Sequence, residues 1–156
     1  MITNRLKLVY IVGGFDGSSS LESYSPFKDT KSSLNSMQFV KKYASAAVLN
    51  GELYHFGGEG FHTVESFIPS QNQWVPRPPL FWKNIHVAGA SVKDRLFVVG
   101  GAKGRQCSSE VEYLDLDIGK WIPTCPMLSK RFSSRQMVRN ETMHFMFRVD
   151  TMELPI

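Results

Sequence analysis

The sequence predicts an all-β fold built from a repeated sheet of four antiparallel strands. Three stretches of aromatic and aliphatic residues, VYIVGG, LYHFGG and LFVVGG, end in glycine pairs whose first members are Gly13, Gly57 and Gly100. Such a stretch is typical of a strand that stops at a tight turn. The glycines recur at intervals of 44 and 43 residues, and a regular period of this length indicates a repeat architecture.

The middle repeat, residues 39–80, contains the signals of all four strands. A strand rich in small residues, 43–49, is followed by Asn50-Gly51, a strong hairpin signal. The second strand, 52–56, ends at a glycine pair, and a third strand alternates over 63–68. After a turn, a fourth strand begins at Trp74, which completes an antiparallel meander.

The next repeat, residues 81–128, keeps the same order of strands and turns. Its first half lies 43 residues beyond the middle repeat and its second half lies 47 beyond, where Trp121 matches Trp74. The difference between the two shifts predicts that four residues are inserted in the loop 102–109.

The two outer repeats depart from this pattern. The first, 1–38, has the second, third and fourth strands but at most a stub of its first, and Lys31 takes the place of the tryptophan. In the last, 129–156, the glycine pair is replaced by Phe147-Arg148, and Arg135 and Gln136 stand where small residues are expected. We therefore do not expect this incomplete last repeat to pack as a normal unit.

The composition is that of a globular protein, with 42% hydrophobic and 21% charged residues in 156. No run approaches the roughly eighteen apolar residues of a membrane-spanning helix, and polar residues follow Met1 in place of an apolar signal core. We expect a cytoplasmic or nuclear protein that binds no membrane. The net charge of +4 is dispersed and lacks the interleaved aromatic residues of a nucleic-acid module, so we expect no nucleic-acid partner.

The residue types that carry catalysis or hold metals do not form a known pattern. Cys107 and Cys125 lack metal spacing and are expected to be reduced thiols. The histidines have no neighbouring cysteine or carboxylate at the spacing of a zinc site: His55, His62, His86 and His144. The glycine-rich loops do not match the phosphate-binding loop, in which a lysine and a serine or threonine follow the glycines. We therefore expect no cofactor, no metal and no enzymatic activity.

The repeated order of elements resembles the kelch repeat. That order is a small-residue strand, a turn, a strand closing in two glycines, a Val-Glu strand, and a tryptophan before a proline-rich segment. The resemblance covers nearly the whole chain and implies a kelch-type β-propeller, in which each repeat forms a four-stranded antiparallel blade. Such propellers usually have about six blades. This chain supplies about three, a fragment too short to close a six-bladed ring, and we expect self-association through its open blade edges.

Within this family the chain is most similar to plant kelch proteins whose propeller follows a development-and-cell-death (DCD) domain. The segments that carry this narrower resemblance are GGFDGSS from Gly13, YASAAVLNGELY from Tyr43 and KWIPTCPML from Lys120. No DCD domain accompanies the partial propeller in this sequence. The resemblance implies a role in plant stress or cell-death responses.

The resemblance to kelch propellers implies a non-catalytic protein–protein interaction module. One alternative is the substrate-recognition part of a ubiquitin-ligase adaptor, although such adaptors carry a separate oligomerisation domain or F-box. Another is an enzyme like the copper radical oxidases, which need a tyrosine, a histidine and a cross-linked cysteine around a metal. The cysteines and histidines of this chain do not supply that set. A truncated gene product without function is a further alternative.

The resemblance places partner binding on the loops between second and third strands and on the links between blades. These segments carry aromatic and cationic side chains of the kind that anchor interfaces: Lys41, Phe61, Trp82, Arg105 and Arg131. Because Lys41, Asn84 and Arg131 occupy one position in successive repeats, we expect a partial ring of donors for an acidic peptide of a partner protein. Other recurring residues are expected to be structural: the glycine pairs, Glu22, Glu65, Glu112, Trp74 and Trp121.

Overall fold

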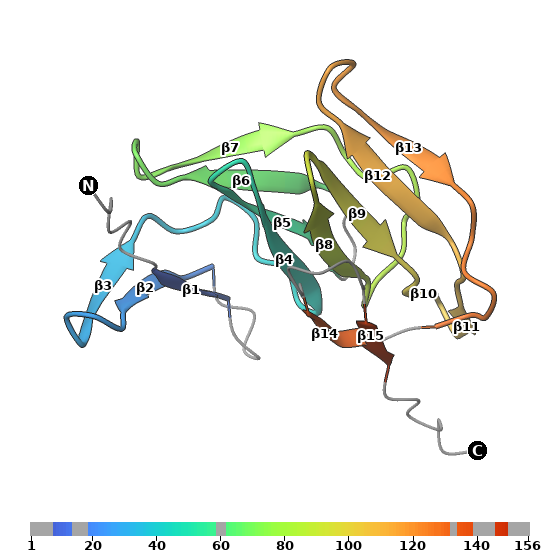
Figure 1. Ribbon diagram of the computed structural model, residues 1–156, viewed down its shortest axis with the longest axis horizontal. Helices are drawn as coiled ribbons and strands as arrows, with labels where there is room; N and C mark the ends of the chain where they lie inside the picture. The colour runs from blue at the N-terminus through green and yellow to red at the C-terminus, as the bar shows by residue number, and fades with distance from the viewer. Residues whose placement is uncertain (1–7, 14–18, 59–61, 132–133, 139–145, 150–156) are drawn as a thin grey trace.

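The computed structural model describes residues 8–13, 19–58, 62–131, 134–138 and 146–149, the last two ranges as backbone only (Figure 1). All regular elements of this part are β-strands in antiparallel sheets, which confirms the predicted all-β fold. No helix in these ranges is long and apolar enough to cross a membrane.

Three consecutive sheets, named here blades 1 to 3, make up most of the fold. Blade 1 consists of β1 (Val9–Val12), β2 (Leu21–Ser25) and β3 (Thr30–Leu34). Blade 2 consists of β4 (Ala44–Leu49), β5 (Glu52–Gly57), β6 (Val64–Ile68) and β7 (Gln73–Arg77). Blade 3 consists of β8 (Ala88–Val92), β9 (Arg95–Val99), β12 (Val111–Asp115) and β13 (Lys120–Thr124).

Two further hairpins accompany the blades. The hairpin of β10 (Ala102–Lys103) and β11 (Gln106–Cys107) lies in the loop between β9 and β12, where the sequence predicts an insertion. Beyond blade 3, β14 (Ser134–Val138) pairs with β15 (Met146–Val149), and their register shifts between Ser134 and Gln136. The backbone therefore forms a hairpin in the last repeat, while the predicted poor packing of Arg135 and Gln136 concerns side chains outside the described part.

Blades 2 and 3 are meanders in which each strand pairs with the next one in the blade, as predicted. Their innermost strands, β4 and β8, pack side by side (Figure 1), and β14 also packs against β8. The sheets thus fan out from one row of inner strands and do not close into a ring. This is the open arrangement expected for a partial β-propeller.

Tight turns hold the strands of a blade together. The Asn50-Gly51 hairpin has positive φ at both residues, 50° and 81°, as a two-residue turn of the predicted kind requires. At the end of β5, Gly58 has φ of 100°, and a Cβ there would lie 2.9 Å from the carbonyl oxygen of Lys42. The glycine pair is therefore fixed by both backbone conformation and close approach of the neighbouring linker.

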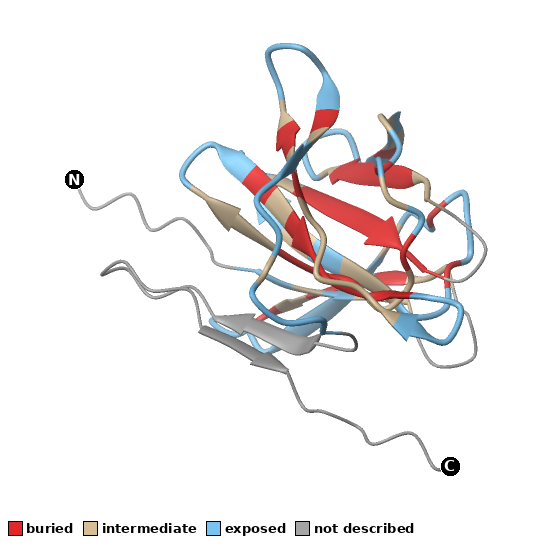
Figure 2. Cartoon of the chain, turned by 90° about the vertical axis from the view of Figure 1, so that its right-hand side faces the viewer, coloured by how far each residue is buried: buried red, intermediate tan, exposed pale blue. Residues whose placement is uncertain are grey.

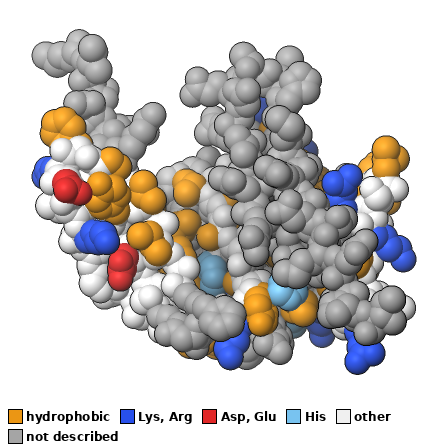
Figure 3. Space-filling model, turned by 90° about the horizontal axis from the view of Figure 1, so that it is seen from below, with side chains coloured by type: hydrophobic (Ala, Val, Ile, Leu, Met, Phe, Trp, Pro, Cys, Tyr) orange, Lys and Arg blue, Asp and Glu red, His pale blue; other side chains and the backbone are white. Residues whose placement is uncertain are grey.

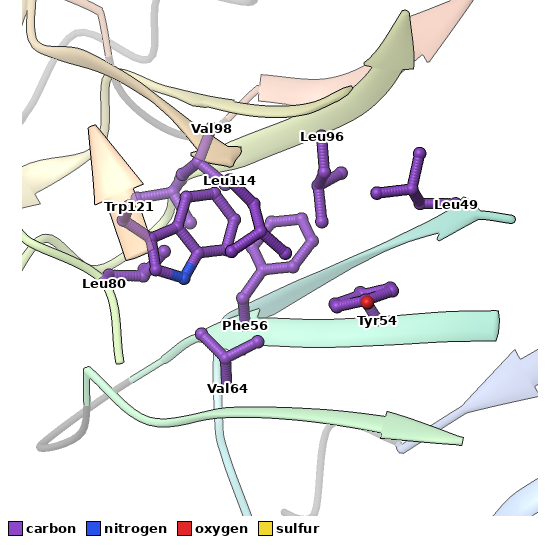
Figure 4. Close-up of a cluster of buried hydrophobic side chains, with 10 residues drawn as sticks. Leu49, Tyr54, Phe56, Val64, Leu80, Leu96, Val98, Leu114 and Trp121 are labelled. Carbon is purple, nitrogen blue, oxygen red and sulfur yellow. The ribbon is translucent and has the colours of Figure 1, made fainter. Parts of the chain in front are cut away.

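The hydrophobic core lies between the blades, in two clusters. One joins blades 1 and 2 and contains Leu21, Met37, Leu53, Phe67 and Trp74. The other joins blades 2 and 3, and in it Phe56 and Trp121 face each other with ring centroids 6.4 Å apart (Figure 4). Buried residues accordingly concentrate in the middle strands, whereas hairpin tips are exposed (Figure 2).

The repeated tryptophans tie each blade to the linker that precedes it. The indole Nε1–H of Trp74 donates to the carbonyl oxygen of Asn35 at 2.8 Å, and that of Trp121 donates to Pro78 at 2.8 Å. Asn35 and Pro78 are 43 residues apart and hold the same place in successive repeats. Both tryptophans are buried, so the structure places them in the structural role that the repeat pattern predicts.

Candidate functional site

Backbone hydrogen bonds join three segments that are distant in sequence into one surface. Ile85 and Ala102 exchange both of their backbone hydrogen bonds, at 3.0 and 2.8 Å. The N–H of Gly101 donates to the carbonyl oxygen of Arg131 at 2.9 Å, and the N–H of Arg131 donates to Ser108 at 2.8 Å. We call the surface formed by residues 81–85, 102–109 and 128–131 the loop surface.

The loop surface is cationic. Its exposed charged side chains are Lys83, Lys103, Arg105, Lys130 and Arg131, and its segments contain no Asp or Glu. The adjacent Glu110 is half-buried and accepts hydrogen bonds from the Asn84 Nδ2 at 2.7 Å and the Ser108 Oγ at 2.8 Å. That carboxylate is therefore engaged within the fold, and the exposed cations dominate what a partner meets.

Two aromatic side chains accompany these cations. Phe81 is 57% exposed, and its ring packs edge-on against Trp82 with centroids 4.8 Å apart. Trp82 is half-buried, and its Nε1–H has no hydrogen-bond partner among the described residues. Aromatic and arginine side chains are the kinds that typically anchor protein interfaces.

Lys41 does not lie where the sequence predicts. Its side chain is buried, with the Nζ 2.9 Å from the carbonyl oxygen of Thr63 and 3.8 Å from the Oε2 of Glu65. Burial lowers the pKa of Lys41 to about 8, although the nearby Glu65 carboxylate acts in the opposite direction. The prediction of an exposed donor is wrong for Lys41, because this cation is enclosed between the linker and blade 2.

Asn84 requires the same correction. It is buried, and its Nδ2 donates to the carbonyl oxygen of Gly100 at 3.0 Å as well as to Glu110. A Cβ on Gly101 would lie 3.0 Å from the Cβ of Asn84, just as one on Gly58 would lie 2.9 Å from that of Lys41. In blades 2 and 3, the residue at this repeated position therefore packs against the second glycine of the pair. The recurrence of this position together with a glycine pair in both repeats was the sequence signal that could have revealed its burial.

The other predicted binding residues remain available or lie outside the described part. Arg105, on the β10–β11 hairpin, and Arg131 are exposed on the loop surface, together with the half-buried Trp82. Phe61 lies outside the described residues. Partner binding by Trp82, Arg105 and Arg131 stays a prediction.

Buried carboxylates fix the linkers between blades. Glu112 is 2% exposed, and its carboxylate accepts the backbone N–H of Phe81 at 2.8 Å and that of Trp82 at 3.3 Å. Burial raises the pKa of Glu112 to about 7, against the effect of these two hydrogen bonds. Glu65 likewise accepts the N–H of Gln38 at 3.3 Å. Glu22, which occupies the same position in blade 1, is exposed, so the structural role predicted for it is not seen there.

The titratable groups that could serve chemistry are dispersed. Within the described ranges, His, Cys, Asp and Glu side chains form no group of three that could hold a metal ion. Both cysteines are free thiols in this structure, Cys125 exposed and Cys107 half-buried. Burial, with a smaller effect of Lys41, lowers the pKa of His55 to about 3, so its imidazole is neutral at neutral pH.

Comparison with known proteins gives one family over more than half of the chain. Residues 41–80 and 85–127 each match the family described as "Kelch motif". Kelch-like protein 35 of Mus musculus is 34% identical over 101 residues, which cover 60% of this chain and 18% of that protein. Kelch repeat and BTB domain-containing protein 12 of Danio rerio is 28% identical over 131 residues, covering 73% of this chain and 21% of that protein. The chain thus spans about a fifth of the length of these curated relatives.

A solved structure shares the fold. The structure titled "Structure of YjhT" superposes with a TM-score of 0.71 and 16% sequence identity, covering 81% of this chain and 51% of that one. At this identity the likeness concerns the fold alone. The curated matches described above are animal proteins, and the narrower similarity to plant proteins with a DCD domain stays a prediction.

Proposed function

This chain belongs to the kelch-repeat family, and from that premise we propose that it is a non-catalytic interaction module that binds an acidic segment of a partner protein. The observation that carries the proposal is the loop surface, on which Arg105, Arg131 and three lysines are exposed without a carboxylate in the same segments. Kelch relatives support a role in protein interaction, since repeats of this kind typically form such modules.

The chemistry of the loop surface suits carboxylates. Arginine donates two parallel hydrogen bonds to a carboxylate, and such charge-assisted bonds are about twice as strong as neutral ones. Clustered cations also accelerate encounter with an acidic partner, an effect that salt weakens. The exposed ring of Phe81, which lies in the same segment as Lys83, would add apolar contact to an acidic peptide that carries a hydrophobic residue.

The test is a binding titration with a fluorescently labelled peptide in which Asp and Glu alternate with Ser and Leu. We expect the double variant Arg105→Glu/Arg131→Glu to weaken binding by about tenfold or more, and added salt to weaken wild-type binding. The matched control is Lys28→Glu/Lys120→Glu, which makes the same change of net charge at exposed sites outside the loop surface. Equal weakening by both double variants would show a diffuse charge effect and would refute the proposed site.

A second candidate is the substrate-recognition part of a ubiquitin-ligase adaptor. The observation that favours it is the set of relatives, which includes Kelch-like protein 35 and a protein named for kelch repeats together with a BTB domain. In cells, an adaptor should lower the level of its bound partner in a proteasome-dependent way. A partner whose level does not respond to the chain would favour the simple interaction module.

Self-association is proposed as well, since one face of blade 1 is uncovered. Val9 and Ile11 are 49% and 47% exposed, whereas the residues at the same positions in blade 2, Leu53 and His55, are each 5% exposed. Uncovered apolar faces of this kind favour association. A monomer at all concentrations in analytical ultracentrifugation would contradict this proposal.

The narrower resemblance supports a role in plant stress or cell-death responses in the cytoplasm or nucleus. It rests on three segments of sequence, beginning at Gly13, Tyr43 and Lys120. Expression of a fluorescent fusion in plant cells, before and after stress, would test both the location and the response. A fusion whose location and abundance ignore stress would argue against this role.

A further inference from the structure

The linker between blades 2 and 3 is held by a buried carboxylate. Glu112 of β12 is 2% exposed, and its two oxygens accept the backbone N–H groups of Phe81 at 2.8 Å and Trp82 at 3.3 Å. The next residue, Lys83, is one of the exposed cations of the loop surface. Seen from below, Lys and Arg side chains gather at the blade 3 end of the molecule, whereas the Asp and Glu side chains visible on this face lie on blade 1 (Figure 3). The position of this part of the cationic surface therefore depends on the bonds that Glu112 accepts.

Glu112 lacks the cation that accompanies its counterpart in blade 2. There the equivalent carboxylate, that of Glu65, lies 3.8 Å from the Nζ of Lys41. At the position of Lys41 in the next repeat the chain carries Asn84, whose amide donates to Glu110. The negative charge of Glu112 is thus buried without the lysine that its counterpart has.

The surroundings of Glu112 favour its neutral form. Its partners on the neighbouring strands, Val98 of β9 and Pro123 of β13, carry no charge. Burial raises the pKa of Glu112 to about 7, against the effect of the two backbone N–H groups, and the negative charge of Glu110 adds a smaller effect in the same direction as burial. The carboxyl group therefore changes its charge around neutral pH.

Protonation changes how many hydrogen bonds Glu112 can accept. An ionised carboxylate accepts with both oxygens, whereas a neutral carboxyl group carries an O–H that donates and has less capacity to accept. We propose that Glu112 is a pH-sensitive clamp on residues 81–85, which holds this part of the loop surface in place when ionised and loosens it when protonated. The inference rests on the proposed binding of acidic segments and adds a mode of regulation to it. Protonation also removes the cost of burying a charge, so the fold as a whole gains stability while the linker loosens.

NMR of the chain without ligand tests the clamp itself. We expect the backbone amide signals of Phe81 and Trp82 to shift together as the pH rises from 6 to 8, with a midpoint of about 7. Glu112→Gln should abolish this titration, because a glutamine side chain keeps one accepting oxygen and no charge.

The matched control is His86→Asn. His86 lies in the chain leading from this linker into β8, and histidine ordinarily titrates at about 6.5, in the same range as the clamp. Its φ is 55°, a conformation that asparagine adopts readily, so the substitution removes the imidazole and keeps the backbone. The amides of Phe81 and Trp82 should titrate in His86→Asn as they do in the wild type.

A binding titration with the acidic peptide tests whether the clamp acts on the loop surface. We expect wild-type affinity to be about fivefold lower at pH 6 than at pH 8, the effect of about one weakened hydrogen bond. The affinity of Glu112→Gln should be low and equal at both values. His86→Asn should respond to pH as the wild type does.

The possible failures are distinguishable. Titration of both amides in a chain that binds the peptide at neither pH would support the clamp and refute the proposed function of the loop surface. Amides that do not titrate, or that titrate unchanged in Glu112→Gln, would overturn the clamp even where the peptide binds. Loss of the titration in His86→Asn would overturn it as well, and this variant decides the question if Glu112→Gln does not fold. Tighter binding at pH 6 would also overturn the clamp, because charge repulsion by Glu112 would then link binding to pH.

Discussion

Replacement of Gly89 by alanine tests how blades 2 and 3 fit together. A Cβ on Gly89 would overlap the ring of Phe56, which is fully buried in the cluster between these blades (Figure 4). Gly89 lies in β8 and has no positive φ, so its backbone can accept alanine and the cost is steric. Overpacking of a core costs about 1 to 3 kcal/mol, and alanine regains about 0.5 to 1 kcal/mol over glycine in a strand. We expect Gly89→Ala to lower the free energy of unfolding by about 1 to 2 kcal/mol.

The decisive measurement is a double-mutant cycle with Phe56→Val. The contact between blades 1 and 2 already has the combination of a smaller side chain with an alanine. Val12 of blade 1 occupies the position of Phe56, and Ala46 of blade 2 occupies the position of Gly89. The double variant should therefore lose at least about 1 kcal/mol less than the sum of the single variants. Urea denaturation at one low protein concentration gives all four free energies.

A matched control separates this steric coupling from general damage. Ala46→Gly lies on the face of β4 toward blade 1, so its effect should add to that of Phe56→Val without coupling. Additive effects of Gly89→Ala and Phe56→Val, or a Gly89→Ala variant as stable as wild type, would refute the proposed fit between the two residues.

Two other measurements address single buried groups. Trp74→Ala should lower the free energy of unfolding by about 3 to 5 kcal/mol. Trp74→Phe should lower it by about 1 to 3 kcal/mol, because the carbonyl of Asn35 loses its hydrogen-bond donor. An unchanged melting temperature in both variants would contradict these roles of Trp74. Because the pKa of Glu112 is raised to about 7 in the fold, the folded state binds more protons than the unfolded state between about 4.5 and 7. The contribution of Glu112 to stability is thus greatest in acid and is lost as the pH rises through 7. In urea titrations, the stability deficit of Glu112→Gln should therefore be larger at pH 5 than at pH 8. A deficit that grows with pH would contradict the assignment.

The strands of blades 2 and 3 could be predicted because their signals are local. The alternation of side chains, the Asn50-Gly51 turn and the glycine pairs each lie within a few residues of the structure that they specify. Repetition then identified Trp74 and Trp121 as structural, since a residue that recurs in register serves every blade. This part of the fold follows from pattern alone.

The surroundings of the linker residues could not be predicted in the same way. The repeat shift correctly gives Lys41 and Asn84 one common position, but it does not say whether that position faces solvent or the glycine turn. Their burial depends on contacts with residues up to 26 positions away in the sequence, such as that of Asn84 with Glu110. A cavity of about 350 Å³ between β1 and β4 likewise arises from the arrangement of two sheets, and no single segment of sequence contains it.

The bonds between each linker and the following blade have a consequence for how the chain unfolds. Trp121 bonds to Pro78, 43 residues away, and Glu112 bonds to Phe81, 31 residues away, so each bond joins one blade to the chain leading into it. Interactions that connect only neighbours along a row make opening begin at the ends and travel inward. Blade 2, which shares a buried hydrophobic cluster with the blade on each side, is then the last part to open, and its amides should exchange hydrogen most slowly.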